Sequence, residues 1–121
     1  MTSYPNYDPA DFSNTPYVRR VEKPWGYELH LVPQDYPYMM KIMHINAGHR
    51  MSLQIHDKKQ ESWLLMNGRA AAIWENEKGE LIETELEPGK GYSVLVGQKH
   101  RLKGITDNDI IETSTPEMGT T

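Results

Sequence analysis

The chain has 121 residues, with 17 acidic and 13 basic side chains and a formal net charge of −4. This acidic balance argues against an electrostatic nucleic-acid binder, which needs a basic patch to neutralise phosphates. The chain contains no cysteine, which excludes disulfides, thiolate metal sites and cysteine nucleophiles and favours a reducing, cytoplasmic location.

The length predicts one domain, preceded by an N-terminal arm over residues 1–17 and followed by a flexible C-terminal tail over residues 117–121. The arm is rich in Pro, Asn, Asp, Ser and Tyr, and Pro5, Pro9 and Pro16 oppose a regular helix. It is more aromatic than a solvated tail, so we expect it to pack against its own subunit or a neighbouring one. Residues 18–116 then form the single folded domain.

Turn signals recur about every ten residues from Tyr17 onward, with short segments of alternating character between them. Many short, evenly spaced strands are typical of a sandwich or barrel and not of a βαβ fold. The pair Asn67-Gly68 lies between two apolar runs and predicts a hairpin, since both central positions of a type I′ turn need positive φ. The sequence therefore predicts an all-β fold.

The segment over residues 50–56 alternates apolar and polar side chains. Because successive side chains of a strand point to opposite faces, Met51 and Ile55 should share one face with Leu53 between them. The other face would carry Arg50, Ser52, Gln54 and His56. Which of the two faces lies inside a barrel is left open by the alternation.

His56 has neighbours with which it could share a site. Gln54 lies two residues before it on the same predicted face, and Glu61 follows five residues later across a short turn. We expect Glu61 to return beside His56 on the second strand of a hairpin. A remote histidine, His100, begins another predicted strand just after a glycine turn at Gly97. Any metal in this cysteine-free chain must be held by imidazole, carboxylate, amide oxygen or water.

In this order and spacing, the chain resembles the cupin superfamily, whose domain is a small double-stranded β-helix barrel of the jelly-roll type. The first cupin motif is similar to Gly48 through Gly68, and the second to Gly91 through His100. Within the superfamily, the chain most resembles the type II mannose-6-phosphate isomerase domain. The matching residues are Lys23-Pro24-Trp25-Gly26, Tyr38, Lys41, Arg50, Ser52-Leu53-Gln54, His56, Glu61, Trp63 and His100-Arg101-Leu102.

The resemblance implies four metal ligands, Gln54, His56, Glu61 and His100. Two imidazoles, a carboxylate and an amide oxygen suit a borderline divalent ion and leave coordination positions for water or substrate. Zinc is the first expectation, with manganese, iron, cobalt or nickel as alternatives.

The resemblance further implies a sugar or sugar-phosphate isomerase of the mannose-6-phosphate isomerase type. Its metal would polarise the carbonyl of the open-chain sugar, and a base would move a proton between C1 and C2. Glu61 is unsuited as the base while it binds the metal, which leaves Lys41, His44 or a metal-bound water. The expected substrate-binding cations are Arg50, Lys59 and Arg101. Lys59 stands where the family commonly has arginine, and so lacks the bidentate fork that suits phosphate.

Two other functions are compatible with the same residues. On ferrous iron, the set of His56, Glu61 and His100 would suit an oxygenase of small organic acids. A cupin that binds a sugar without converting it is the other. We expect a small-molecule substrate, no nucleic-acid or membrane partner, and, by analogy with small cupins, a homodimer in which the arm is exchanged.

Overall fold

The computed structural model describes residues 8–12 and 14–116, so the expected tail over 117–121 and much of the arm lie outside the described residues. The described part of the arm contains one turn of 3-10 helix, η1 (Pro9–Asp11), where the sequence predicts only extended chain. Proline is tolerated in a first turn because its missing N–H would have no helical partner there. Asp8 caps this turn by accepting a hydrogen bond from the backbone N–H of Ala10 at 3.0 Å.

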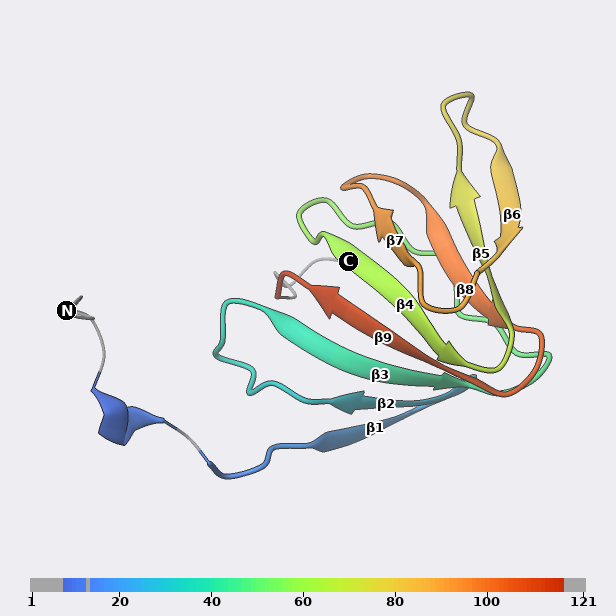
Figure 1. The fold of residues 1–121 in the computed structure, drawn as a ribbon. Helices are drawn as coiled ribbons and strands as arrows, with labels where there is room; N and C mark the ends of the chain where they lie inside the picture. Colours follow the sequence, from blue (N-terminus) through green and yellow to red (C-terminus); the bar gives the residue numbers. More distant parts are fainter. Residues whose placement is uncertain (1–7, 13, 117–121) are drawn as a thin grey trace.

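The rest of the fold is all-β, as predicted, and its strands form two antiparallel sheets (Figure 1). The large sheet has the order β1-β2-β3-β9-β4-β7, and the small sheet has the order β6-β5-β8. No helix in the described ranges has the length and apolar character needed to cross a membrane. The strands are β1 (Arg19–Lys23), β2 (Gly26–His30), β3 (Met39–Ile45), β4 (Glu61–Asn67), β5 (Ala70–Glu75), β6 (Leu81–Glu85), β7 (Gly91–Val94), β8 (His100–Gly104) and β9 (Asn108–Ser114).

The core lies between the two sheets because β3, β4, β5, β8 and β9 each turn buried apolar side chains inward. In β3 the alternate residues Met43 and Ile45 are buried, and in β4 Trp63 and Leu65 are buried. The small sheet contributes Leu102, Ala70 and Ala72 to the same cluster. This burial is the main favourable term for the fold.

The predicted hairpin at Asn67-Gly68 is wrong. β4 belongs to the large sheet and β5 to the small one, so the chain passes from one layer to the other here instead of pairing with itself. Gly68 does take a positive φ of 74°, but no described residue other than glycine does, so the type I′ geometry is absent. A Cβ on Gly68 would lie 2.2 Å from the carbonyl oxygen of Asp107, which is why this crossing needs glycine.

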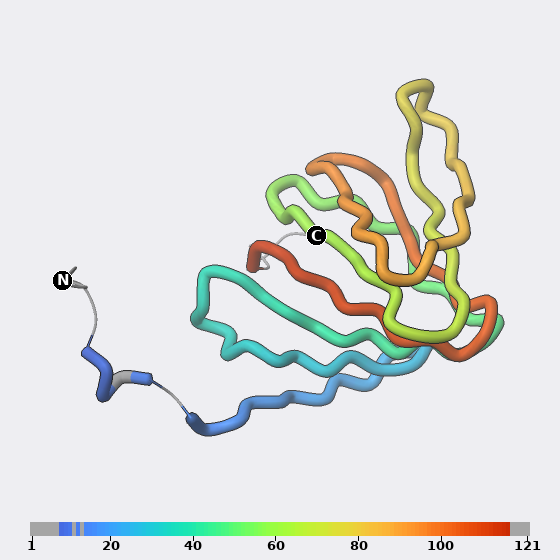
Figure 2. The backbone as a smooth tube through the Cα atoms, viewed as in Figure 1, coloured from blue at the N-terminus to red at the C-terminus, as the bar shows by residue number. Residues whose placement is uncertain are grey.

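The segment over residues 50–56 is extended but is not a regular strand. Two isolated bridges hold it against β8, Arg50 with Lys103 and Gln54 with His100, and Figure 2 shows this green segment running beside the orange β8. Met51 is buried and Ile55 is 47% exposed, so the predicted sharing of one face by the apolar residues is wrong. Without a continuous ladder, the strict alternation of a strand is not imposed.

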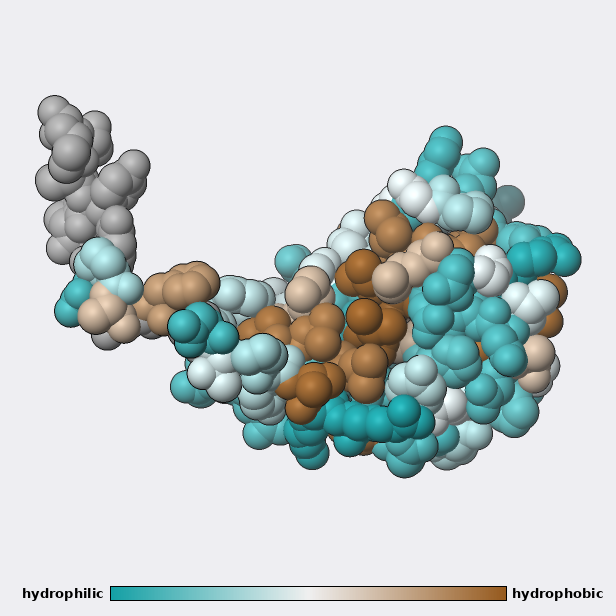
Figure 3. All heavy atoms as spheres, turned by 60° about the horizontal axis from the view of Figure 1, so that its bottom comes forward, coloured by the Kyte–Doolittle hydropathy of each residue, from teal (hydrophilic) through white to brown (hydrophobic). Residues whose placement is uncertain are grey.

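The outward face of the large sheet is apolar along one cross-strand row. The register aligns Leu29, Ile42, Ile111 and Leu64 across β2, β3, β9 and β4, and all four are half-buried. Figure 3 shows apolar side chains gathered in the middle of the lower side of the molecule, bordered by hydrophilic residues. Phe12 in the arm is 79% exposed, so it does not pack against this apolar row.

The homodimer stays a prediction, and the apolar outer face supplies a physical reason for it. We expect light scattering of the purified chain to give a mass near twice 14.0 kDa. Removal of residues 1–17 should weaken the association if the arm is exchanged. A mass of one chain at micromolar and higher concentrations would contradict the prediction.

Candidate functional site

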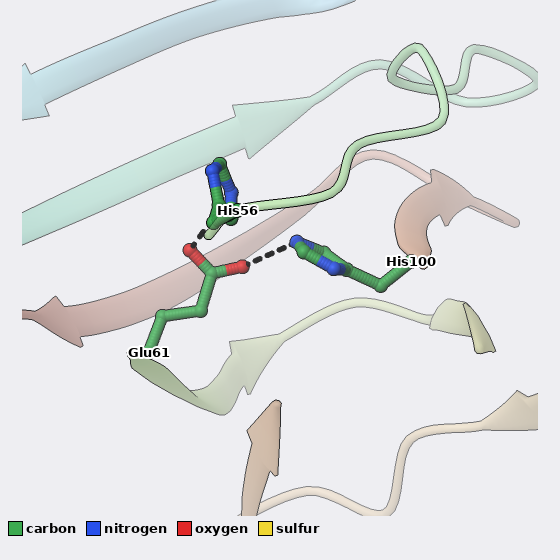
Figure 4. A group of neighbouring side chains, drawn as sticks. All are labelled: His56, Glu61 and His100. Carbon is green, nitrogen blue, oxygen red and sulfur yellow. Dashed lines mark ion pairs between the residues drawn. The ribbon is translucent and has the colours of Figure 1, made fainter. Parts of the chain in front are cut away.

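Three buried side chains from separate parts of the chain converge between the sheets. His56 ends the extended segment, Glu61 begins β4 in the large sheet, and His100 begins β8 in the small sheet. Backbone hydrogen bonds fix this convergence. Gln54 and His100 exchange N–H···O bonds of 2.8 and 2.9 Å, and the N–H of Gly97 donates to the carbonyl of His56 at 2.7 Å. The three side chains, here called the triad, point toward one another in Figure 4.

The triad has the geometry of a metal site. One candidate ligand atom from each residue lies within 4.8 Å of the others. Glu61 presents Oε1 at 2.8 Å from His100 Nε2 and Oε2 at 4.0 Å from His56 Nε2. All three residues are at most 5% exposed. Gln54, the fourth expected ligand, lines the same cavity.

The hydrogen bonding of His100 shows that these residues fit a metal ion. Its Nδ1 lies 2.8 Å from the carbonyl oxygen of Gln98, and a carbonyl only accepts, so Nδ1 carries the proton. If the imidazole of His100 is neutral, the lone pair of its Nε2 faces Glu61 Oε1 at 2.8 Å. Because both of these atoms are hydrogen-bond acceptors, a proton or a cation must lie between them. A ligating histidine whose other nitrogen donates to a backbone carbonyl is the usual second-shell arrangement. The donor set is that of a borderline divalent metal.

Without a metal, protons take that role, as the direction of the pKa shifts indicates. Burial alone would raise the pKa of Glu61, but the hydrogen bond with His100 and the charge of Lys59 outweigh it and lower the pKa to about 2. Burial opposes the charged form of His100, yet the hydrogen bond with Glu61 raises its pKa above the ordinary value.

A second group of charged residues lies in the same cavity, which has a volume of about 630 Å³. Lys59 Nζ lies between two carboxylates, 3.3 Å from Glu61 Oε2 and 3.5 Å from Glu112 Oε2. Further from the triad, Glu28 Oε1 contacts His30 Nε2 at 2.8 Å and Lys41 Nζ at 3.7 Å. Burial, followed by the charge of Glu61, raises the pKa of Glu112 to about 7. The cavity therefore combines a candidate metal-binding triad with a buried carboxyl group, Glu112, whose pKa lies near neutral pH in the metal-free chain.

The pKa shifts predict how the stability of the metal-free chain depends on pH. The pKa of Glu112 is about 7 in the folded chain against an ordinary 4.5, so its protonated form stabilises the fold fully below pH 4.5, and this contribution is lost as the pH rises to 7. Glu61 acts oppositely, since its stabilising contribution is present above pH 4.5 and is lost as the pH falls toward 2. We expect the Glu112→Gln variant to gain free energy of unfolding relative to wild type as the pH rises. The difference between variant and wild type should be roughly 1 to 3 kcal/mol larger at pH 7.5 than at pH 5. Urea titrations after chelation check this, and equal differences at both pH values would contradict it.

The other sequence-predicted residues divide into two groups. Lys41 and Lys59 line the cavity and are buried. His44 lies on the outward face of β3, because it alternates with the inward Lys41 and Met43; there it stacks on Tyr27 and contacts Asp109 at 2.8 Å.

Neither expected arginine lies among the residues that line the cavity. Arg50 is exposed beside Lys103, and Arg101 alternates with the inward His100 in β8. We therefore assign no substrate contact to these arginines and no proton transfer to His44.

Glu28, His30 and Glu112 are among the cavity residues that were not predicted from the sequence. The signal for Glu112 is its alternation with Ile110 and Ser114, all three of which are buried in β9. This alternation places a carboxylate on the face of a strand that also carries a core isoleucine.

No curated protein sequence matches the chain. Among solved structures, a mutant of the oxalate decarboxylase OxdC of Bacillus subtilis is similar with a TM-score of 0.74 and 16% identity, over 90% of this chain and 32% of that one. The capsular polysaccharide assembling protein CapF from Staphylococcus aureus is similar with a TM-score of 0.71 and 18% identity, over 89% of this chain and 30% of that one. The chain thus spans about a third of the length of these proteins, and at such identities the likeness shows a shared cupin fold. The family model for the mannose-6-phosphate isomerase C-terminal domain matches residues 11–117, and the chain belongs to this family of cupin domains.

Proposed function

We propose that this chain is a divalent-metal-dependent aldose–ketose isomerase that acts on a sugar or sugar phosphate. The observation that carries the proposal is the buried triad of His56, Glu61 and His100 in a cavity that also holds the Lys59–Glu112 pair. Isomerisation requires an electrophile that polarises the sugar oxygens, which a metal ion can supply, and a group that moves a proton between adjacent carbons. Membership of the mannose-6-phosphate isomerase family supports the same reading.

Gln54 and the triad would hold the metal, which when bound polarises the carbonyl and neighbouring hydroxyl of the open-chain sugar. The residues of the chain then have separate tasks. Glu61 holds the ion and is not available as a base. Glu112, a buried carboxyl group in contact with Lys59, takes the proton from C2 of the aldose and returns it to C1, while the proton of the C2 hydroxyl passes to the C1 oxygen. The Lys59 ammonium, which contacts both carboxylates, favours the charged form of Glu112 after it has lost the proton.

Lys41 is the cross-strand partner of Glu112 in β3. It therefore lies one strand further from the triad than Glu112 does. Its positive charge lowers the pKa of Glu112 and partly offsets the effect of burial. We assign Lys41 to positioning and charge balance, and proton transfer to Glu112.

The test is turnover of mannose 6-phosphate to fructose 6-phosphate by the purified full chain loaded with zinc or manganese, with metal content measured on the same sample. We expect turnover that a chelator abolishes and added metal restores, because the polarising ion is removed and returned. The unphosphorylated aldose serves as a parallel substrate. Absence of turnover on every hexose and hexose phosphate, with one metal ion per chain confirmed, would refute the proposal.

A second candidate function rests on the composition of the triad alone. Two histidines and one carboxylate with open positions form the ligand set of ferrous oxygenases. Dioxygen uptake that depends on ferrous iron and a small organic acid would favour this function. A tightly held zinc ion without any response to dioxygen would count against it.

A further inference from the structure

Trp63 brings a hydrogen-bond donor to the cavity that holds the triad. It follows Glu61 by two residues in β4, and both side chains are buried on the inward face of that strand. Trp63 is 4% exposed and is one of the residues that line the cavity. The centroid of its ring lies 5.8 Å from that of His100, which is a contact distance for aromatic rings. The indole therefore packs against a member of the triad.

The indole N–H of Trp63 lacks an acceptor within the part of the chain that the structure describes. Its Nε1 is buried and has no hydrogen-bond partner among residues 8–12 and 14–116. An indole nitrogen only donates, and the N–H of a buried tryptophan usually has a partner. A buried donor without one costs free energy and needs an explanation. A ligand oxygen in the cavity would supply the missing acceptor.

Trp74 shows that the fold does pair an indole N–H elsewhere. Trp74 lies in β5 of the small sheet, and its Nε1 donates to Oγ1 of Thr84 on the neighbouring strand at 3.0 Å. It is not among the residues that line the cavity of the triad. The unpaired donor thus belongs to the tryptophan beside the triad, which points to a role for Trp63 in that cavity.

Trp63 also lies beside the group to which we assign proton transfer. It is the cross-strand partner of Glu112 in the pairing of β4 with β9, and both side chains are buried. Residues directly opposite in an antiparallel pair have Cβ atoms about 4.5 to 5.5 Å apart. Oε2 of Glu112 also makes no hydrogen bond, although Lys59 Nζ lies 3.5 Å from it. A ligand group at this point would therefore have a donor and a carboxyl group next to it.

We propose that Trp63 Nε1 donates a hydrogen bond to the substrate oxygen on which negative charge develops during isomerisation. This rests on the proposed function for the reaction itself. When Glu112 takes the proton from C2 of the open-chain aldose, the electron pair of that C–H bond forms a C1–C2 double bond. The electron pair of the carbonyl bond then moves onto the C1 oxygen. Because this oxygen adjoins the carbon that faces Glu112, a donor beside Glu112 is within its reach. A fixed donor in a buried site stabilises such a charge.

The first test follows the indole N–H groups by NMR in the full chain labelled with nitrogen-15. The chain has three tryptophans, Trp25, Trp63 and Trp74, and substitution of each by phenylalanine assigns its signal. The probe is arabinonohydroxamate, which cannot be isomerised and whose ionised head group is planar with its charge on oxygen. We expect the probe to move the proton signal of the Trp63 indole downfield in the zinc-loaded chain and to slow its exchange with water. The signal of Trp74 should stay in place, because its N–H already has a partner.

The second test is Trp63→Phe, which keeps an aromatic ring and removes the donor. We expect kcat to fall by roughly 10²-fold, as for the loss of one fixed donor at a developing charge, with KM within about threefold of wild type. Calorimetry should show about tenfold weaker binding of arabinonohydroxamate, since a hydrogen bond to a charged oxygen is lost. Metal content and the binding of arabinitol, which lacks the charged head group, should stay within about threefold.

The matched control is Trp74→Phe, which removes an indole N–H that is bonded to Thr84 outside the cavity. It should leave kcat, metal content and the binding of both probes unchanged. If Trp63→Phe does not fold, the NMR test on the wild-type chain still decides, with the Trp63 signal identified as the one that remains after Trp25 and Trp74 are assigned.

A Trp63 signal that does not move at saturating arabinonohydroxamate would overturn the proposal. So would an equal loss of affinity for both probes in Trp63→Phe, because a packing defect has that effect. These readouts are independent of turnover. A hydrogen bond from Trp63 to the hydroxamate, in a chain without isomerase activity, would refute the proposed function and keep Trp63 as a donor to a charged oxygen. Wild-type kcat in Trp63→Phe would refute the role of Trp63 and leave the isomerase standing.

Discussion

Replacement of His56 by alanine should lower the bound divalent metal from one ion per chain to less than a tenth, and isomerase activity should fall at least 100-fold with it. His56 supplies one of three buried ligand atoms that lie within 4.8 Å of one another. Loss of an outer-shell partner alone typically costs 10- to 100-fold in metal affinity or activity, and loss of a direct ligand should cost more. Elemental analysis of protein purified without added metal gives the occupancy, and the mannose 6-phosphate assay gives the activity.

His44→Ala is the matched control for this variant. His44 also contacts a carboxylate at 2.8 Å, that of Asp109, but it does so on the outward face of β3. Its replacement should leave metal content and activity within about twofold of wild type. Full metal occupancy in His56→Ala would mean that the ligands lie elsewhere, and equal metal loss in both variants would indicate a general effect on folding.

Glu112→Gln should reduce kcat by roughly 10²- to 10⁴-fold, the contribution expected of a positioned acid–base group, while the metal remains bound. Glutamine keeps the shape of glutamate but does not take up a proton at neutral pH. The variant therefore separates proton transfer from metal binding, because Glu112 is no member of the triad. Steady-state kinetics on the metal-loaded protein measure kcat and KM, and elemental analysis confirms occupancy.

The control for Glu112→Gln is Glu85→Gln. Glu85 is an exposed residue of β6 that pairs with Arg69 at 2.8 Å, on the small sheet and outside the cavity. Its kcat should equal that of wild type. A kcat for Glu112→Gln within threefold of wild type would remove Glu112 as the base and leave Lys41 or a metal-bound water as the remaining candidates.

The composition and local pattern of the chain were enough to predict its class of fold and the chemistry of its metal donors. The regular turn signals predicted the all-β architecture that the two sheets confirm. The absence of cysteine restricted the donors to nitrogen and oxygen. The order of His56, Glu61 and His100, read with the family resemblance, named three residues that the fold brings together.

The local sequence pattern could not predict which face of a strand lies inside the fold. The alternation of side chains along a strand predicts that Lys41 and His44 lie on opposite faces of β3. Only the packing of the two sheets against each other places Lys41 inside. The same holds for the extended segment, in which Met51 and His56 are both buried although a regular strand would separate them. Two isolated bridges to β8 decide this orientation.

Glu112 and Ser114 mark the limit of what the sequence by itself determined. The sequence fixes their residue types and shows that they share a strand face. Their position beside Glu61 depends on the pairing of β9 with β4, which joins residues about fifty positions apart in the chain. Such long-range pairings are set by the burial of complete sheet faces and not by local preference. The sequence by itself therefore determined which residues can act as donors, whereas the tertiary structure decided that they line one cavity.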